Sequence, residues 1–240
     1  MFKIKIADFI VEIHNSYDFI FRQCSDYIYD GEEKADIIAT CTQEQIDDEK
    51  KIITDACYSD GYIESICLYR SLCLQLPAKD AFVMHAAVIS VDGKGYAFTA
   101  KSGTGKSTHI LQWHGLLGDK VVVVNGDKPI LRFLDGKLYV YGTPWCGKEG
   151  WNTNTRAELC GLCFLERAEN NFIEPIPSKD AANRIMKQIL LPKDSLGVIK
   201  TLDMIDKMIM NTKIWKLGCN VSIDAAKVAY RAMSGGKYED

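Results

Sequence analysis

The stretch that decides the fold runs from residue 96 to residue 108 and reads Tyr-Ala-Phe-Thr-Ala-Lys-Ser-Gly-Thr-Gly-Lys-Ser-Thr. An apolar, strand-like run leads into a glycine-rich segment, and a helix signal follows it. Gly103 and Gly105 carry no Cβ, so the backbone N–H groups there can curl around an anion. The helix that begins here brings the positive end of its dipole to the same place. The stretch therefore predicts a phosphate-binding loop between a strand and a helix.

Individual residues of this loop have expected tasks. Lys106 is expected to reach the β- and γ-phosphates of a nucleotide, and the Ser107 hydroxyl is expected to bind Mg²⁺. One position departs from the usual pattern, because Ala100 stands where the first glycine is common. The expected ligand is ATP with Mg²⁺. The predicted nucleotide-binding residues are Ser102, Gly103, Thr104, Gly105, Lys106, Ser107 and Thr108.

The composition is typical of a soluble globular protein. The chain has 240 residues, of which 47% are hydrophobic and 25% charged, and its formal net charge is −3. A charge this small favours neither nucleic acid nor an anionic membrane as a partner. No apolar run approaches the ~20 residues that a membrane span needs, and the start of the chain lacks the apolar stretch of a signal peptide. A cytoplasmic location is therefore expected.

The cysteines are scattered among apolar residues. There are nine of them, an odd number, and this distribution favours buried thiols in a reducing compartment. Cys160 and Cys163 have the spacing of zinc and redox sites, but they lie in a strand-like run in which positions three apart face opposite sides. No second pair follows, so neither metal binding nor redox chemistry is expected of them.

The apolar pattern divides the chain into two predicted domains. Residues 1–80 carry strand signals and, over 62–76, the spacing of a helix, which predicts a small α+β subdomain and a candidate for substrate binding. Residues 81–240 alternate between strand and helix patterns and predict an α/β core with a mixed sheet. The charged stretch 43–51 is expected to be exposed. The expected core elements are strands at 82–90, 95–100, 121–124 (covered on both faces), 130–133, 138–141 and 159–165, and helices at 107–117, 178–191 and 222–233.

A predicted hairpin brings a histidine to the loop. Asp92-Gly93 is typical of a two-residue turn, which would pair His85 with Ala100 across the hairpin. A four-residue turn would pair it with Ser102 instead. Either register brings His85 to the mouth of the phosphate-binding loop. This favours a role beside the phosphates over that of a core histidine.

A second predicted hairpin brings an aspartate to the same place. With Asp135-Gly136 as its turn, Asp127 lies opposite Pro144, and the segment 142–150 returns to the end of the strand at 121–124. A carboxylate at the end of the strand after a phosphate-loop helix is where such proteins hold Mg²⁺. Asp127 is therefore predicted to bind metal, together with Ser107, or to act as a general base.

Other charged residues near these segments are weaker candidates. Glu149 lies between two glycines in the returning segment, which favours it over an ordinary surface acid. Lys128 and Lys148 are candidates for binding phosphate or substrate charge, although a solvated surface position suits them equally well. Arg156 precedes a predicted strand and is a candidate for neutralising the transferred phosphoryl group, although an ordinary surface position suits it equally well.

Together these residues resemble the catalytic domain of HPr kinase/phosphorylase and its relatives, within the P-loop group related to ATP-dependent phosphoenolpyruvate carboxykinase. The resemblance covers residues 81–190 and is carried by Met84-His85, by the hairpin and loop that follow, and by the Val-Val-Asn-Gly-Asp-Lys run ending at Lys128. It implies a P-loop kinase core of this type with a mixed sheet. His85, Lys106 and Ser107 match the family's histidine and its loop residues.

The chain departs from the family at its paired aspartates, which fall on Gly126 and Asp127. The resemblance implies that Asp127 binds metal or activates the acceptor hydroxyl, with Glu149 or a water in the other role. The family's Arg-Gly-rich signature is not visible after Glu149. The chain therefore resembles the small relatives more than the enzyme that phosphorylates HPr. Decarboxylation is not expected, and the resemblance leaves open whether the reverse or phosphorolysis reaction occurs.

The function expected from the sequence is transfer of the γ-phosphoryl of ATP to a hydroxyl, foremost a serine of a peptide or protein. Its predicted catalytic residues are Asp127, His85, Lys106 and Glu149. Two alternatives stay open: a kinase for a small hydroxyl compound, and a nucleotide-binding regulatory module without transferase activity. The sequence leaves open the acceptor, the nucleotide base and whether the chain forms a homo-oligomer.

Overall fold

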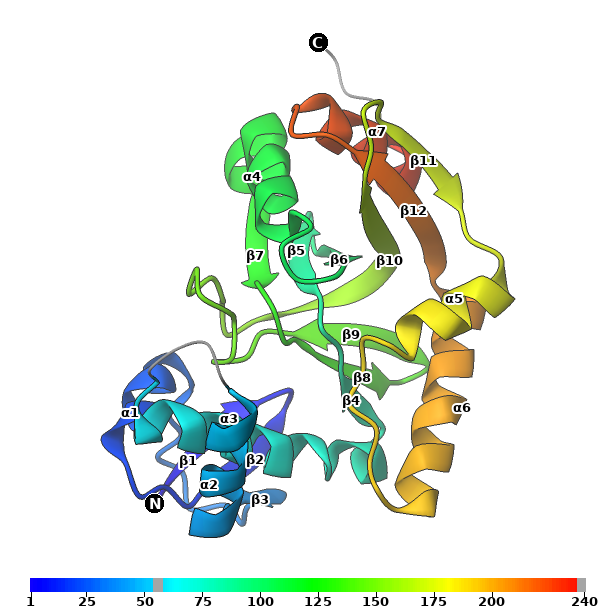
Figure 1. The fold of residues 1–240 in the computed structure, drawn as a ribbon. Helices are drawn as coiled ribbons and strands as arrows, with labels where there is room; N and C mark the ends of the chain where they lie inside the picture. The colour runs from blue at the N-terminus through cyan, green and yellow to red at the C-terminus, as the bar shows by residue number, and fades with distance from the viewer. Residues whose placement is uncertain (54–57, 237–240) are drawn as a thin grey trace.

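The N-terminal third of the chain forms a small sheet of its own. The computed structural model describes residues 1–53 and 58–236, and Figure 1 shows the small sheet and its helices in blue to cyan. Strands β1 (Phe2–Ile6) and β2 (Phe9–Ile13) make an antiparallel hairpin, and β3 (Ile37–Ala39) pairs parallel to β2. The helices here are α1 (Asp18–Gln23), α2 (Gln43–Ile52) and α3 (Asp60–Cys73).

The helix expected at 62–76 is α3, with different ends. It begins at Asp60 because the Ser59 side chain accepts a hydrogen bond from the Tyr62 N–H. It ends at Cys73, and a short 3-10 helix, Leu76–Lys79, follows with Pro77 in its first turn. Its buried face packs on the small sheet. Members of that core include Ile4, Val11, Ile13, Leu68 and Leu72.

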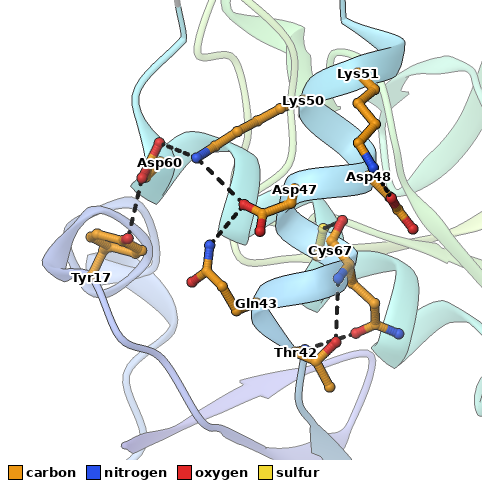
Figure 2. A network of polar contacts seen from close by, with 10 residues as sticks. Tyr17, Thr42, Gln43, Asp47, Asp48, Lys50, Lys51, Asp60 and Cys67 are labelled. Atoms are coloured by element: carbon orange, nitrogen blue, oxygen red, sulfur yellow. Dashed lines mark hydrogen bonds and ion pairs between the residues drawn. The ribbon is translucent and has the colours of Figure 1, made fainter.

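The charged stretch at 43–51, expected only as an exposed segment, is helix α2. A capping box starts the helix, because Thr42 and Gln45 each bond the other's backbone N–H through their side chains (Figure 2). Lys50 forms an ion pair with Asp60 at 2.8 Å, which ties α2 to the start of α3. The apolar stripe of α2 is narrow, since Ile46 is its buried hydrophobic residue, and this explains why the apolar pattern did not predict a helix.

The large sheet is mixed, as expected. Its strands lie in the order β4-β8-β9-β10-β6-β5-β7, and β12 pairs with both β10 and β11. β10 runs parallel to β6 and β12 and antiparallel to β9. The strands are β4 (Ala81–Val83), β5 (Ala87–Val91), β6 (Lys94–Thr99), β7 (Val121–Asn125), β8 (Ile130–Leu134), β9 (Lys137–Tyr141), β10 (Arg156–Arg167), β11 (Phe172–Pro175) and β12 (Lys213–Cys219).

Helices cover both faces of this sheet. On one face, α4 (Lys106–Leu117) and α7 (Asp224–Ser234) pack on residues such as Phe98. On the other face, α5 (Ser178–Ile185) and α6 (Ser195–Asn211) pack on residues such as Ala97 (Figure 1). Neighbouring residues of β6 thus enter different cores, because side chains alternate along a strand. β6 is therefore covered on both faces.

The strand expected at 82–90 is two strands. β4 pairs with β8, whereas β5 pairs with β6 and β7, and the chain crosses from one part of the sheet to the other between them. At this crossing the backbone N–H of His85 donates to the Gln188 carbonyl at 2.7 Å, and that of Ala86 donates to the Asp127 carbonyl at 3.0 Å. These bonds replace a regular strand ladder. They place His85 where three segments meet.

Two further expectations were wrong in detail. The strand at 121–124 is not covered on both faces, because β7 ends the strand order and Val122 is 40% exposed. The helix expected at 178–191 ends at Ile185, since Ile189 forms an isolated bridge with Met84. Besides α2, the elements α1, α6, β11 and β12 were not predicted. The hairpin turns at Asp92-Gly93 and Asp135-Gly136 are both confirmed by their strand registers.

Residue 80 separates the two sheets, but the core does not divide there. One hydrophobic cluster contains Ile4 and Leu72 from before this point and Ala81 and Ile130 from after it. The division into a substrate-binding subdomain, 1–80, and a core, 81–240, stays a prediction. No helix in the described ranges is long and apolar enough to cross a membrane.

The cysteines of the described residues are free thiols. Cys163 is buried and Cys160 half-buried, and Cys57 lies outside the described residues. Within residues 1–53 and 58–236, no group of three His, Cys, Asp or Glu side chains is arranged to hold a metal by itself.

Candidate functional site

The segment 100–105, called the Gly-rich loop below, connects β6 to α4. Gly103 and Gly105 have φ angles of 75° and 123°, in the region that favours glycine. A Cβ at either position would meet no atom within 4 Å, so the space beside this backbone is open to a ligand. A side chain from another strand holds the loop, because Arg167 at the end of β10 donates to the Gly103 carbonyl at 2.7 Å.

A cavity of about 530 Å³ opens on this loop. It brings together six of the seven predicted nucleotide-binding residues and all four predicted catalytic ones. Thr104 is the exception, since it lines a neighbouring cavity instead. The cavity residues are Tyr62, His85, Ser102, Gly103, Gly105, Lys106, Ser107, Thr108, Gly126, Asp127, Gly147, Lys148 and Glu149.

His85 lies between the loop lysine and the aspartate. Its Nε2 atom is 3.2 Å from Lys106 Nζ and 3.0 Å from Asp127 Oδ1. The hairpin register accounts for this, because Val91 pairs with Lys94 and Ala87 with Phe98 before the chain turns out of the sheet. The Thr99 hydroxyl then donates to the His85 carbonyl at 2.8 Å, which holds the crossing segment against the end of β6.

The two neighbours of His85 Nε2 require different protonation states of that nitrogen, because Lys106 is a donor and the Asp127 carboxylate is an acceptor. A neutral ring with its proton on Nδ1 donates to Gln188 Oε1, at 3.3 Å, and accepts from Lys106 at Nε2. A ring with a proton on Nε2 donates to Asp127 instead. One nitrogen cannot do both at once, so the proton position on His85 is coupled to which of the two neighbours it binds.

The charges in the cavity shift the acidities of its groups. Burial alone would raise the pKa of Asp127, but the hydrogen bond from His85 and the positive charges of His85, Lys128 and Lys106 together lower it. Burial lowers the pKa of Lys106, and the charges of Asp127 and Glu149 oppose this in part. Asp127 is therefore ionised at neutral pH.

The carboxylate of Asp127 is placed by a buried asparagine. Asn125 Oδ1 accepts hydrogen bonds from the backbone N–H groups of Asp127, at 2.9 Å, and Lys128, at 2.7 Å. Its Nδ2 donates to the Thr143 carbonyl at 2.9 Å. Asn125 thus joins the end of β7 to the segment 142–150. Sequence reasoning did not identify Asn125, although an asparagine two residues before a site aspartate is a typical signal of such a turn.

Glu149 contacts the start of α4. Ser107 Oγ donates to Glu149 Oε1 at 2.9 Å, which brings the returning segment over the Gly-rich loop. The same segment packs closely on Gly126, because a Cβ there would lie 2.7 Å from the Cys146 carbonyl oxygen. A carboxylate at position 126 does not fit this arrangement. The second carboxylate beside Ser107 comes from Glu149.

The remaining charged candidates lie elsewhere or are exposed. Arg156, suggested above for phosphoryl charge, instead pairs with Asp8 at 2.9 Å and donates to the Tyr141 hydroxyl. That interpretation was wrong, because Arg156 begins β10, whereas the Gly-rich loop lies near the end of β10. The Lys148 side chain is 90% exposed, and its Nζ lies 4.0 Å from Glu149.

Two residues at the loop were missed by sequence reasoning. Arg167 contacts the Gly-rich loop. Its position at the carboxyl end of β10, the strand beside β6, could have indicated this contact. Tyr62 of α3 lines the cavity from the N-terminal third. No local signal marks Tyr62, because its place depends on how α3 packs against the large sheet.

Comparison with known proteins adds little to this geometry. No family model matches the chain. No curated protein sequence matches it either. Among solved structures, the chain is similar to the HPr(Ser) kinase/phosphatase from Coxiella burnetii. The identity is 18%, the match covers 53% of this chain and 97% of that chain, and the TM-score is 0.30. A similarity this low says nothing about activity, so function is inferred from the residues themselves.

Proposed function

We propose that this protein binds ATP at the Gly-rich loop and transfers its γ-phosphoryl group to a hydroxyl. The observation that carries this proposal is the meeting of five side chains around one cavity. Lys106 and Ser107 begin α4, and the other three come from three separate segments. His85 contacts Lys106 at 3.2 Å, and Asp127 contacts His85 at 3.0 Å. Glu149 contacts Ser107 at 2.9 Å. A cavity that brings titratable side chains from several segments to a glycine-rich helix start has the features of a candidate active site.

The loop supplies the groups that an ATP triphosphate needs. The backbone at Gly103 and Gly105 is open, and the start of α4 adds its dipole. Lys106 has three N–H donors and a single hydrogen-bond acceptor, His85, among the described residues. Two donors therefore remain for phosphate oxygens.

The residues present also fit Mg²⁺. The Ser107 hydroxyl and the carboxylates of Asp127 and Glu149 are oxygen ligands of the kind that Mg²⁺ prefers, and they lie beside the open loop. When bound there, Mg²⁺ would neutralise charge on the β- and γ-phosphates. We assign Ser107 and Asp127 as its ligands, with Glu149 orienting the Ser107 hydroxyl.

Asp127 is the proposed base. As the acceptor oxygen forms its bond to the γ-phosphorus, the bond to the bridging oxygen breaks, ADP leaves, and the hydroxyl proton passes to an Asp127 oxygen. The lowered pKa keeps Asp127 ionised before transfer, so its oxygens carry no proton when the acceptor arrives. His85 holds the carboxylate in place by its Nε2 contact. Lys106 balances negative charge that spreads over the transferred group.

We propose serine in a peptide or protein as the acceptor. A regulatory module that binds nucleotide without transfer is the second candidate, and it is favoured by the absence of a carboxylate at Gly126. The contact between Glu149 and Ser107 argues for the enzyme, because it supplies a second carboxylate at the same place.

Calorimetry of Mg·ATP binding tests the nucleotide site. Lys106→Ala is expected to weaken binding by about 10–100-fold, the usual range for losing hydrogen bonds to a charged group. Lys120→Ala is the matched control, because Lys120 is exposed and lies outside the cavity. Equal affinity of folded wild type and Lys106→Ala would contradict the proposed site. Tight binding without transfer to any hydroxyl would favour the regulatory module.

A further inference from the structure

A second groove reaches the same histidine. It is bounded by α3, by β4 and by residues 187–190, which we call the acceptor groove, and its volume is about 280 Å³. The segment between α5 and α6 runs beside β4 (Figure 1), and its residues 187–190 line the groove. His85 lines both this groove and the cavity at the Gly-rich loop. A molecule in the groove therefore lies next to the histidine that contacts Asp127.

The walls of the groove are held by backbone bonds. The Gln188 carbonyl accepts from the His85 N–H at 2.7 Å, which ties the 187–190 segment to the end of β4. The Lys128 carbonyl accepts from the Tyr69 hydroxyl at 2.8 Å and from the Thr143 hydroxyl at 2.9 Å. The groove is thus formed before any ligand arrives, which lowers the entropy cost of binding.

Among the described residues, the lining of the groove contains positively charged side chains and no carboxylate. Arg70 is neutralised by Glu49, which it binds through two hydrogen bonds of 2.6 and 3.1 Å. Lys128 and Lys187 have no ion-pair partner within residues 1–53 and 58–236, and no Asp or Glu of these ranges lines the groove. Lys128 follows Asp127 directly, and its charge contributes to the lowered pKa of that carboxyl.

The rest of the lining is largely apolar. Ile66 of α3, Val83 of β4, and Ile189 and Leu190 contribute carbon surface between the two lysines and His85. A ligand that satisfies this lining needs an acidic group for the ammonium groups and an apolar group for the carbon surface. Inorganic phosphate has the charge but not the apolar part.

We propose that the acceptor groove binds the phosphoryl acceptor and that this acceptor is a serine in an acidic peptide segment with an apolar neighbour. The inference rests on the proposed function. Lys128 and Lys187 recognise carboxylates beside the serine, and the apolar wall takes the neighbouring side chain. The serine hydroxyl then enters the shared space at His85 and Asp127, where the transfer described above takes place.

Two capped tetrapeptides test the inference, Glu-Ser-Glu-Leu and Gln-Ser-Gln-Leu, which have the same size and differ only in charge. Their affinities for the full chain are measured by calorimetry without nucleotide, and their phosphorylation is measured with γ-labelled ATP. We expect the acidic peptide to bind about fivefold to tenfold more tightly, as partly exposed ion pairs allow. Lys187→Glu should abolish that preference and raise the KM for the acidic peptide, while leaving the KM for ATP unchanged.

The control is Lys200→Glu, which makes the same charge change at an exposed position on α6 outside the groove. It should keep the preference for the acidic peptide. Equal affinities of the two peptides, or a preference that survives Lys187→Glu, would overturn the inference. Phosphorylation of glycerate, a small hydroxy acid, in preference to the peptide would also overturn it.

Failure of the proposed function would look different. In that case Mg·ATP would not bind to the wild type, whereas charge-dependent binding of the peptide, measured without nucleotide, would persist and would still depend on Lys187. The two measurements therefore separate a wrong acceptor from a wrong activity.

Discussion

Replacing Asp127 by asparagine separates transfer from nucleotide binding. Asparagine has the same shape, and its Oδ1 atom can still accept from His85 Nε2, which lies 3.0 Å from the carboxylate. The hydrogen bonds from the Asp127 N–H to Asn125 Oδ1 and from the Ala86 N–H to the Asp127 carbonyl do not involve the Asp127 side chain and remain. The substitution therefore removes the charge and the basicity while keeping the position. Folding stability is expected to change by less than about 1 kcal/mol.

Transfer should fall by about 10²–10⁴, the range for losing a positioned general base, which corresponds to about 3–5 kcal/mol in the barrier. Affinity for Mg·ATP should change by less than about tenfold, because two effects oppose each other. Loss of the charge removes one metal ligand, but it also removes a negative group near the phosphates. Lys106 should still bind the phosphates, since its hydrogen-bond contact is with His85 and not with Asp127.

The assay combines γ-labelled ATP with the acidic tetrapeptide, and calorimetry gives the nucleotide affinity of the same samples. Asp119→Asn is the control, because Asp119 is exposed and outside the cavity. Transfer by Asp127→Asn at the wild-type rate would show that Asp127 is not the base. Glu149→Gln would then be the next variant to test. No transfer by the wild type to any acceptor would favour the regulatory module.

Two further predictions concern stability. Gly126→Asp should destabilise the fold by about 1–3 kcal/mol, because its Cβ would lie 2.7 Å from the Cys146 carbonyl oxygen; unchanged urea denaturation would contradict this close packing. His109 is buried, accepts from Trp113 Nε1 at 2.9 Å, and has its pKa lowered by burial to about 4. The unfolded chain therefore binds this proton first, so stability should fall by about 3 kcal/mol as the pH drops from about 6.5 to about 4. Urea denaturation at several pH values measures the fall. It should persist in His114→Gln, which changes an exposed histidine, and shrink in His109→Gln.

The local parts of the site were predictable because short-range geometry determines them. A two-residue turn at Asp92-Gly93 leaves one register for its strands, and that register carries His85 to the end of β6. The turn at Asp135-Gly136 returns the chain to Asp127 in the same way, and Thr143 does contact Lys128. The glycine pattern of the Gly-rich loop likewise needs only the residues on either side of it.

Other features depend on contacts between distant segments, which no local pattern encodes. The partners of Arg156 and of Ser107 are such cases, because Asp8 lies 148 residues from Arg156 and Glu149 lies 42 residues from Ser107. The exposure of β7 follows from its place at the end of the strand order, and the early end of α5 follows from the bridge between Met84 and Ile189.

The sequence by itself therefore determined the Gly-rich loop between β6 and α4 and the two hairpins, because turn geometry acts over a few residues. Only the tertiary structure decided that Glu149 reaches Ser107, that Gly126 has no room for a second aspartate, and that the acceptor groove meets the cavity at His85. Each of these depends on how packed segments approach one another, and close packing is a property of the whole core rather than of any one stretch.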